Sequence, residues 1–518
     1  MKKVLSTSVV AVLLISTLAA CGSSKDGEKA SGSSSSPSST TKAVEKKYKI
    51  RAMNILYGAA PPDNGAGKKA IEERYNIDLE YIPVVSGEYN NKLGVTLASG
   101  DVPDIVLIPF LDNQWNTAID GGQFMPLTKY INDKANYPNF SKISPDLQSI
   151  LKVKGEVYGI PRFRGVPGQT QVLRKDWMDK LGLKTPTNYD ELFEVLKAFK
   201  EKDPDGNGKN DTFGATASLN GTDINIGVNM ASFKAGPNLG WVEDGKGGII
   251  PSDFAPNTKA AYGYIAKLYK EGLIPQDFAV RKDAQSEDDF LLGKAGSTHG
   301  WSYTAYNNDR LKKARAVEPK WAVAPVAPLK APDGYQGYVK SYGYFGAFLL
   351  NKDLLKDEGK LKKALQILND QMGDEGASFI KWGVEGVHYK VDNGNKVALD
   401  ANNVDGPNKY HLTDPLAEGD WIFGSADTDE VKKLKKDSFK VAMEGKPWLR
   451  QEEGLYSKAN AEKGAELKKY VTDEMIKVIM GEKPVDYIDQ IFESWKSRGG
   501  NDIMKEFNDA WKNRKDGK

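Results

Sequence analysis

The stretch that decides the fold class is YNNKLGVTLASGDVPDIVLIP, residues 89–109. Leu93, Val95 and Leu97 belong to a predicted helix that ends before Gly100. The IVLI run that follows is entirely apolar, which is typical of a strand buried on both faces of a sheet. A helix that leads through a short turn into a buried strand is the repeating unit of α/β sheets.

The residues before this stretch continue the alternation of strands and helices. YKIRAMNILYG (48–58) predicts a buried strand, KKAIEERYNID (68–78) a helix, and DLEYIPV (78–84) a second strand. Alternation of this kind implies a parallel or mixed sheet with helices on both faces. The fold class is therefore predicted to be α/β.

The residues after it predict a second lobe. VYGIPRFRGVPGQTQVL (157–173) is punctuated by Gly and Pro, which indicates a crossing between lobes. The next predicted helix starts with Thr187 as its N-cap, and YGYFGAFLLNKD (342–353) predicts a further strand. The apolar stripe of that helix consists of Leu192, Phe193, Leu196 and Phe199. The length of 518 residues also exceeds what one core normally supports.

Composition excludes several classes of function. The 72 basic and 70 acidic residues nearly cancel, so no general field for nucleic acid is present and no nucleic-acid partner is expected. A single Cys rules out a disulfide framework. The 3 His residues are too far apart in sequence to form a helical zinc motif.

The N-terminus predicts export. Lys2 and Lys3 precede an uncharged stretch that ends in LAACG (18–22), and this string resembles the bacterial lipobox, in which the Cys is lipidated. Residues 1–20 are predicted to be a signal peptide and 21–47 a flexible linker anchored by a lipid such as palmitate on Cys21. The protein would then work at the outer face of the bacterial cytoplasmic membrane. An ordinary secretory signal with a chance Cys is the alternative.

Four strings occur in order behind the lipobox: ASGDVPDIV (98–106), GEVYGIPR (155–162), LRKDWMDKLGLKTPTNYDE (173–191) and DPDGNGKNDT (203–212). Together they resemble the large lipoprotein solute-binding proteins of carbohydrate ABC importers, the group that includes the alginate-binding proteins. The resemblance implies a two-lobed, periplasmic-binding-protein-like (type II) α/β fold, with mixed sheets flanked by helices and a hinge between the lobes. By analogy, lobe 1 would hold 48–163 and 335–380, and lobe 2 would hold 164–334 and 381–518.

The resemblance also implies the partners. The protein would act as a monomer that captures a carbohydrate, expected to be an oligosaccharide, and delivers it to ABC permease and ATPase subunits. The sequence contains no Walker-type Gly-rich stretch, so the chain would not itself power transport. No nucleophile elbow is present either, and no carboxylate pair stands out, so we expect no enzyme activity.

The string DPDGNGKND (203–211) has the spacing of a calcium loop. Oxygen-bearing side chains fall at loop positions 1, 3, 5 and 9, a glycine falls at position 6, and position 7 would contribute a backbone carbonyl. Position 12 is Gly214 instead of a bidentate Glu, so a further ligand would have to come from elsewhere. The family resemblance supports a structural calcium, and a solvated Asx-rich turn is the alternative. The candidate metal ligands are Asp203, Asp205, Asn207, Lys209 and Asp211.

Aromatic residues beside glycines are the candidate sugar contacts. Flat rings bind the apolar C–H faces of a pyranose, while amides and charged groups bind its polar rim. For any single aromatic residue, packing in a core is the competing interpretation. The candidates are Trp301, Trp241, Trp382, Tyr342, Tyr344 and Tyr57.

Two further groups are candidates for the polar rim. Arg162 and Arg164 flank Phe163 where the chain should pass the cleft, and such forks match the carboxylate of an acidic sugar such as a uronate. A surface charge or an interlobe ion pair is the alternative for them. Asn113 and Trp115 follow the IVLIP strand, and strand ends line crevices in open α/β sheets.

Two other functions remain open from the sequence. One is a membrane-anchored polysaccharide-degrading enzyme, because a chain with 70 acidic residues offers many carboxylate pairs. The other is a peptide-binding transport protein, which would share the fold and the export signal.

Overall fold

The computed structural model describes residues 46–56, 59–109, 111, 113–164, 170–301, 306–413 and 422–515. Residues Lys46–Lys518 form one compact unit, and the description below concerns this unit alone. Among its described helices, none is both long enough and apolar enough to cross a bilayer.

A five-stranded mixed sheet organises the first half of the fold. β1 (Tyr48–Leu56) pairs in parallel with β2 (Ile77–Val85) and β3 (Ile105–Ile108). β15 (Tyr344–Leu350) then pairs antiparallel with β3 and with β6 (Gly159–Phe163). The strand order is β2-β1-β3-β15-β6. This arrangement confirms the mixed sheet expected from the sequence.

The hydrophobic pattern explains these elements. All four residues of β3 are buried, as a central strand covered on both faces requires. On α2 (Tyr89–Ser99), Leu93 is fully buried, but Val95 is 64% exposed. Tyr89, Leu93 and Thr96, spaced at three to four residues, form the inward face of α2, so Val95 points to solvent. Val95 therefore does not belong to the apolar face of α2.

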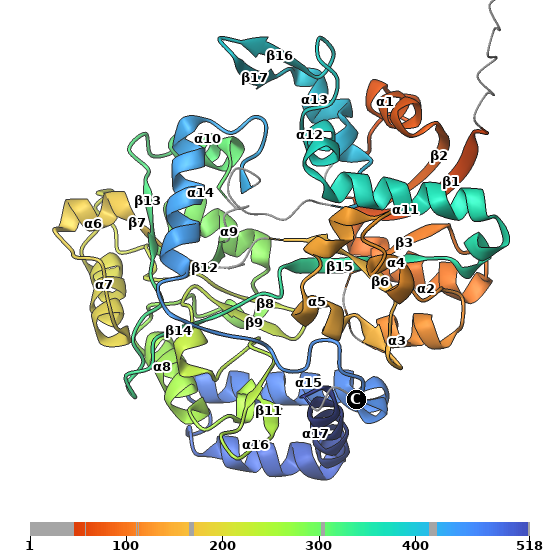
Figure 1. Cartoon of the computed structure of the whole chain (residues 1–518). Coiled ribbons are helices and arrows are strands. Elements are labelled where there is room, and N and C mark those ends of the chain that lie inside the picture. Colours follow the sequence, from red (N-terminus) through yellow and green to blue (C-terminus); the bar gives the residue numbers. More distant parts are fainter. Residues whose placement is uncertain are drawn as a thin grey trace, which may run out of the picture. The chain divides into compact units, whose positions relative to one another are not determined.

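A second set of strands and helices builds the other half. β7 (Thr170–Arg174) lies between β12 (Ser297–Trp301) and β13 (Val323–Val326), and both pair with it antiparallel. β8 (Ala217–Asn220) and β9 (Asp223–Ile226) form a hairpin beside them. Figure 1 shows α15 (Lys458–Ile479), α16 (Tyr487–Trp495) and α17 (Asn501–Lys515) gathered below this region.

Helix α7 (Tyr189–Glu201) corrects one detail of the sequence analysis. The N-cap is Asn188, whose Oδ1 accepts from the N–H of Glu191 at 2.9 Å. Thr187, the predicted cap, instead donates through N–H and Oγ1 to Glu191 Oε2, each at 2.8 Å. Because α7 begins at Tyr189, Asn188 occupies the capping position directly before the helix, and Thr187 lies one residue too early. The predicted apolar stripe is confirmed, because Leu192, Phe193, Leu196 and Phe199 are all buried.

Two large hydrophobic cores correspond to two lobes. The first contains Ile50, Trp115, Phe163 and the inward residues of β15, and it includes Tyr410 and Leu412 from far along the chain. The second contains buried residues between Leu173 and Ala331, together with those of α15, α16 and α17. A smaller core holds Val172, Phe290, Trp321 and Val431.

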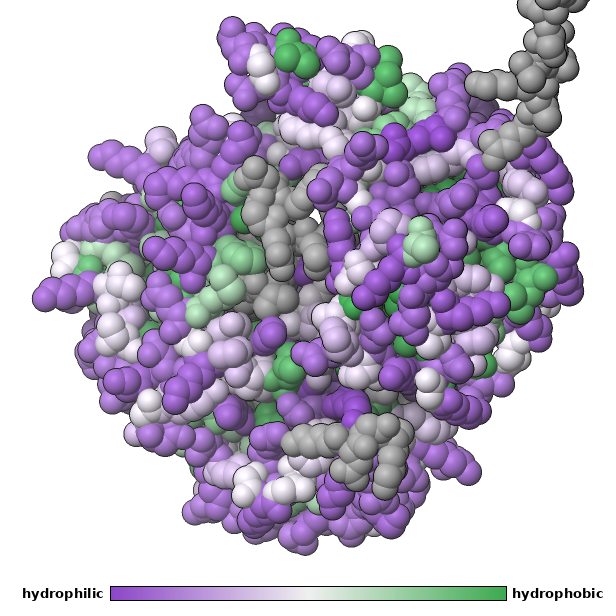
Figure 2. Space-filling model, viewed as in Figure 1, coloured by the Kyte–Doolittle hydropathy of each residue, from purple (hydrophilic) through white to green (hydrophobic). Residues whose placement is uncertain are grey.

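Other α-helices and strands complete the described part of the fold. The remaining helices are α1 (Ala66–Tyr75), α3 (Asn113–Asp120), α4 (Thr128–Ile131), α5 (Pro145–Ile150), α6 (Lys175–Leu181), α8 (Thr258–Lys270), α9 (Asp283–Leu291), α10 (Asn308–Arg315), α11 (Glu358–Met372), α12 (Asp374–Trp382), α13 (Asp400–Asp405) and α14 (Asp429–Ala442). The remaining strands are β4 (Lys152–Val153), β5 (Glu156–Val157), β10 (Trp241–Glu243), β11 (Ile249–Pro251), β14 (Gly337–Val339), β16 (Tyr389–Asp392), β17 (Asn395–Ala398) and β18 (Lys446–Trp448). Figure 2 shows that hydrophilic residues cover most of one face of the protein.

Candidate ligand-binding site

A cavity of about 680 Å³ receives residues from both halves of the fold. Strands β8, β9 and β12 of the second half form one wall. Residues 338–341, which lead toward β15 of the first sheet, form another together with Tyr344 and Phe345 at the start of β15. Arg450 and Glu453, from the segment before α15, complete the lining. Its volume falls within the ~300–1,000 Å³ usual for ligand pockets.

Alcohol and amide side chains dominate the β8–β9 wall. Ser218 and Asn225 are cross-strand partners in the hairpin, so their side chains share one face. Asp283 of α9 accepts from Ser218 Oγ at 2.7 Å, from Asn225 Nδ2 at 3.0 Å and from Asn220 Nδ2 at 2.8 Å. This carboxylate orients three polar side chains, so the wall presents a fixed set of donors and acceptors. The other polar residues of the lining are Thr216, Asn229, Asn238, Ser286, Thr298 and Ser341.

The start of β15 brings aromatic rings to the cavity. Tyr344 and Phe345 both line it. The backbone turns sharply next to them: Gly346 has a φ of 71°, and a Cβ there would lie 2.4 Å from the carbonyl oxygen of Ile108. Only glycine fits where the backbone at position 346 passes so close to β3. At the same place, the pairing of β15 with β6 shifts register between Tyr344 and Ala347. Both aromatic residues therefore lie at an irregular start of β15, where Tyr344 contacts the first core and also lines the cavity.

Charged groups of both signs surround the cavity. Arg310 donates from Nε to Glu287 Oε1 at 2.7 Å, and Arg450 donates from Nη2 to the carbonyl oxygen of Asn238 at 2.7 Å. The Arg164 guanidinium lies 5.2 Å from the centre of the Phe345 ring, which places a cation against a lining residue. Desolvation lowers the pKa of His299, also in the lining, to about 4, so this imidazole is neutral at physiological pH.

Five of the predicted contacts take clear positions. Tyr344 lines the cavity, and Trp241, half-buried, lines a second cavity described below. Tyr342 packs against the first core. Arg162 is buried, with Nη2 2.9 Å from His411 Nε2. Trp115 is fully buried in the first core, and a Cβ on Gly159 would lie 2.7 Å from its ring.

The other predicted contacts lie elsewhere or outside the described residues. Trp382 ends α12 and makes an edge contact with Tyr389 of β16 at 6.2 Å, and it lines neither cavity. The backbone of Trp301 pairs with Thr170 at the end of β12, but its side chain lies outside the described part, as does that of Asn113. Tyr57 and Cys21 also fall outside the described residues.

Sequence reasoning missed the polar face of the β8–β9 hairpin and the segment 450–453. The alternation in ASLNGTDINI (217–226) places Ser218, Asn220 and Asn225 on one side, and this period of two was the available signal. Arg450 and Glu453 carried no comparable signal, because a loop more than 200 residues away has no sequence relation to the hairpin.

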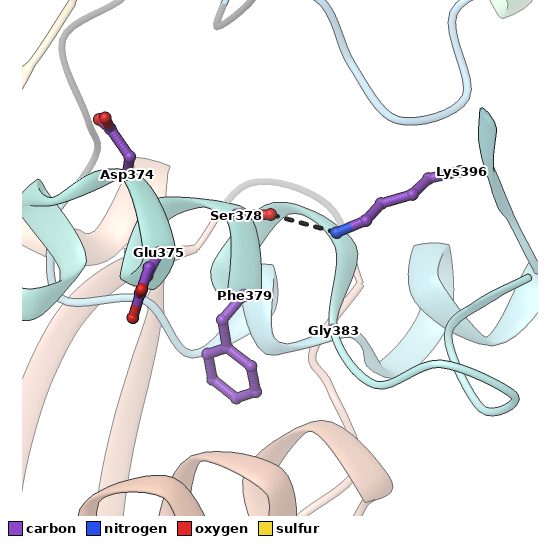
Figure 3. Close-up of a pocket in the computed structure, with 6 residues that line it drawn as sticks. All are labelled: Asp374, Glu375, Ser378, Phe379, Gly383 and Lys396. Carbon is purple, nitrogen blue, oxygen red and sulfur yellow. Dashed lines mark hydrogen bonds between the residues drawn. The ribbon is translucent and has the colours of Figure 1, made fainter. Parts of the chain in front are cut away.

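A second cavity of about 740 Å³ adjoins the first. It lies among β9, β10 and α15, and five residues line both cavities: Ile224, Asn225, Pro237, Asn238 and Arg450. A third hollow is shallow and lies on α12. Figure 3 shows Lys396 of β17 donating to Ser378 Oγ at 3.3 Å across it, with Phe379 below and Asp374 pointing away.

The loop 203–211 is tightly wound by its own side chains. Asp203 accepts from the N–H groups of Gly206 and Gly208 at 3.1 and 3.0 Å. Asn207 donates from Nδ2 to Asp205 at 2.8 Å and to Asp211 at 3.1 Å. In the part of the chain that the structure describes, no three or more His, Cys, Asp or Glu side chains are gathered as a metal site would require.

Two α/β cores that both contribute to one polar cavity define the architecture of a solute-binding protein. A family model described as "bacterial extracellular solute-binding protein" matches residues 68–345, which is more than half of the chain. The protein belongs to this family.

Two relatives from Bacillus subtilis (strain 168) match almost the whole chain. The polygalacturonan/rhamnogalacturonan-binding protein YtcQ is 31% identical over 510 residues, covering 97% of this chain and 99% of the relative. Lipoprotein LipO is 30% identical over 512 residues, covering 96% of each chain. The solved structure of alginate-binding protein AlgQ2 without calcium ion has a TM-score of 0.66 at 22% identity, covering 90% of this chain and 98% of that one. This likeness confirms the two-lobed, periplasmic-binding-protein-like α/β fold.

Proposed function

We propose that the protein captures an oligosaccharide in the cavity between its lobes and delivers it to the permease and ATPase subunits of an ABC importer. The observation that carries this proposal is the lining of the cavity: oriented alcohols and amides on β8–β9 line the same cavity as Tyr344 and Phe345. Saccharides need both kinds of surface, because a pyranose has a polar rim and apolar faces.

An acidic sugar fits the cavity better than a neutral one. Arg164 beside Phe345, with Arg310 and Arg450 in the lining, provides guanidinium groups that can pair with a carboxylate. The name of the B. subtilis relative YtcQ, which binds polygalacturonan and rhamnogalacturonan, supports a uronate-containing ligand. Arg310 already pairs with Glu287, so Arg164 and Arg450 are the main candidates for the sugar carboxylate.

The proposed movement is closure about a hinge. We propose the lobes that the sequence predicts, 48–163 and 335–380 for lobe 1 and 164–334 and 381–518 for lobe 2, with one change. Tyr410 and Leu412 pack in the first core, so the segment from 381 to 412 is placed with lobe 1. The position of residues 338–345 at the cavity supports the proposed hinge, because a segment that leaves one core and enters the other lines the ligand site. Bound ligand would then be enclosed by residues of both lobes, which favours the closed form.

The loop 203–211 is proposed to hold a structural calcium ion. The fit is supported by the convergence of Asp205 and Asp211 on the same amide group of Asn207, since oxygens that share one donor also lie within reach of one cation. Rotation of the Asn207 amide would replace its NH₂ group with Oδ1, a calcium ligand. The positive φ of Gly208, 76°, provides the sharp turn at position 6 of such loops.

We further propose that Cys21 carries a lipid and that the body works at the outer face of the cytoplasmic membrane. The lipobox-like LAACG string and the Ser-rich segment after it support this. The B. subtilis relative named lipoprotein LipO does so as well.

Tryptophan fluorescence melting of the full chain in detergent tests the proposed function. Oligogalacturonides, neutral oligosaccharides and peptides are each added separately, because a ligand that binds only the native state raises the melting temperature. We expect stabilisation by oligogalacturonides, with no change in their length on overnight incubation. Stabilisation by peptides alone would overturn the proposal in favour of peptide transport, and cleavage of the sugars would overturn it in favour of an enzyme.

A further inference from the structure

The second cavity shares a wall of five lining residues with the first. Asn238 connects the elements of this wall: its Nδ2 donates to the carbonyl oxygen of Ile224 at 2.8 Å and to Asn225 Oδ1 at 3.2 Å. Arg450 Nη2 donates to the carbonyl oxygen of Asn238 at 2.7 Å. Asn225 is exposed, and Asn238 and Arg450 are half-exposed, so the ridge that these three residues form between the two cavities is polar and accessible to solvent.

Aromatic rings and carboxyl groups meet in the second cavity. Trp241 lines it, held by an edge contact with Phe507 at 4.8 Å between ring centres. Glu452 accepts from the backbone N–H of Trp241 at 2.9 Å, and Asp253 accepts from Tyr262 Oη at 2.5 Å. Each carboxylate has about four lone-pair positions, so both keep acceptor capacity for sugar hydroxyls.

Helix α15 leaves the space for a ligand. The residues that it presents to the cavity include Ala461, Gly464 and Ala465, all without a long side chain. Ala461 and Ala465 are exposed, so this part of the cavity is reached from solvent. The volume of about 740 Å³ lies beside the indole of Trp241.

The two cavities differ in the charges around them. Cations and carboxylates line the first in equal number, Arg310, Lys340 and Arg450 with Asp283, Glu287 and Glu453, and Arg164 lies next to it as a further cation. In the second, Lys468 is paired with Asp223 at 2.6 Å, while Asp253 and Glu452 are the inner carboxyls. Burial raises the pKa of Asp253 to about 6 and that of Glu452 to about 7, so another carboxylate between them would be opposed by both desolvation and repulsion.

We propose that the second cavity is an additional saccharide subsite, continuous with the first across the ridge of Asn225, Asn238 and Arg450, and that it takes an uncharged sugar unit. Trp241 contacts a face of this unit, and Asp253 and Glu452 accept from its hydroxyls. This inference rests on the proposed function. The ligand would then be an oligosaccharide long enough to occupy both cavities, with acidic units in the first and a neutral unit in the second.

The test compares two probes by calorimetric titration of the full chain in detergent. The short probe is a galacturonate disaccharide, and the long probe is a rhamnogalacturonan octasaccharide, in which acidic and neutral units alternate. We expect the long probe to bind wild-type protein at least about tenfold more tightly, a difference of ~1.4 kcal/mol. If the long probe binds no more tightly than the short one, the additional subsite is refuted.

Ala465→Tyr fills the second cavity without removing a contact, and Glu466→Tyr, on the neighbouring exposed position of α15, is the matched control. Ala465→Tyr should abolish the advantage of the long probe and leave the short probe unchanged within about twofold, while Glu466→Tyr should change neither. Unchanged binding of the long probe by Ala465→Tyr overturns the proposal. Failure of wild-type protein to bind either probe refutes instead the acidic ligand given under the proposed function, on which this inference rests.

Glu452→Gln tests the preference for an uncharged unit while keeping an acceptor for the Trp241 N–H. A galacturonate octasaccharide, acidic in every unit, should bind this variant at least about threefold more tightly than wild-type protein. The disaccharide should bind both equally. An unchanged affinity for the acidic octasaccharide contradicts the charge preference of the subsite.

Discussion

Tyr344 donates a hydrogen bond from Oη to Glu453 Oε2 at 2.5 Å, and this bond joins the first sheet to the segment before α15. The two residues are 109 positions apart in sequence, and both line the first cavity. Burial raises the pKa of Tyr344 well above its usual value, so the phenol stays protonated and remains a donor. The bond couples the wall of the ligand site to the packing of both halves of the fold.

Tyr344→Phe should lower the free energy of unfolding by about 1–2 kcal/mol, because it removes a hydrogen bond to a charged acceptor and keeps the ring. Urea denaturation measures the change. Tyr342→Phe is the control: its Oη is 3.5 Å from the carbonyl oxygen of Arg450, so its loss should cost less. A double-mutant cycle with Glu453→Gln should show a coupling energy above ~0.5 kcal/mol, and additive effects would contradict the link.

Arg164→Gln should weaken binding of oligogalacturonides about tenfold and leave neutral oligosaccharides unaffected, because a guanidinium that pairs with a carboxylate is lost. Calorimetric titration at two salt concentrations should also show a smaller salt dependence in the variant. Arg498→Gln is the control, since Arg498 also stacks on a ring, that of Tyr470 at 4.0 Å, but away from the cavity. Equal losses for acidic and neutral ligands would argue against a role for Arg164 in charge recognition.

Asp205→Asn should abolish the thermal stabilisation that calcium gives to the wild-type protein. Removing one negative charge from the loop 203–211 weakens a site built from hard oxygen ligands. The measurement is the melting temperature with calcium and with chelator. Asp244→Asn alters another Asx turn, in which Asp244 accepts from Lys246 and Gly248, and it should leave the calcium effect intact. Wild-type protein that melts at the same temperature in both conditions would refute the calcium site.

The pKa of Glu452 makes a pH dependence testable. Burial raises it to about 7 from an ordinary value of 4.5, so the folded protein binds this proton more tightly than the unfolded chain. Stability therefore falls as pH rises from about 4.5 through 7, and the loss is complete above the folded pKa. Glu452→Gln removes this dependence. The melting temperature of the variant minus that of wild-type protein should therefore increase between about pH 5 and about pH 8. A constant difference across that range would contradict the assignment.

Cys21→Ser should release the protein from the membrane fraction into the medium, because the thiol that would carry the lipid is absent and the chain has only 1 Cys. Cell fractionation with immunoblotting provides the measurement. Ser23→Ala, two residues along, is the control and should remain with the membrane. Release of wild-type protein to the same extent would indicate an ordinary secretory signal.

Much of the fold followed from local patterns. The apolar run of β3 and the apolar stripe on α7 predicted buried elements that the structure contains. Such predictions succeed because the spacing of apolar residues along a short segment indicates which of its faces is buried. Thr187 and Asn188 show the limit of such local prediction. Both residue types are good helix caps, and only the structure shows that Asn188 accepts from the N–H of Glu191. Trp115 shows another: a tryptophan in a loop-like setting packs in the core, because helix α3 turns it toward Gly159.

By itself, the sequence determined the α/β class and the resemblance to carbohydrate-binding lipoproteins, and it predicts an export signal, since each depends on residues close together in the chain. Only the tertiary structure decided which side chains share a cavity. Tyr344, Asn225 and Arg450 come from three distant segments, and their proximity results from packing of two cores that no local pattern encodes. The same packing places Trp241 beside Glu452 in the adjoining cavity, where low solvent access raises the pKa of the carboxyl and shapes the proposed preference for a neutral sugar.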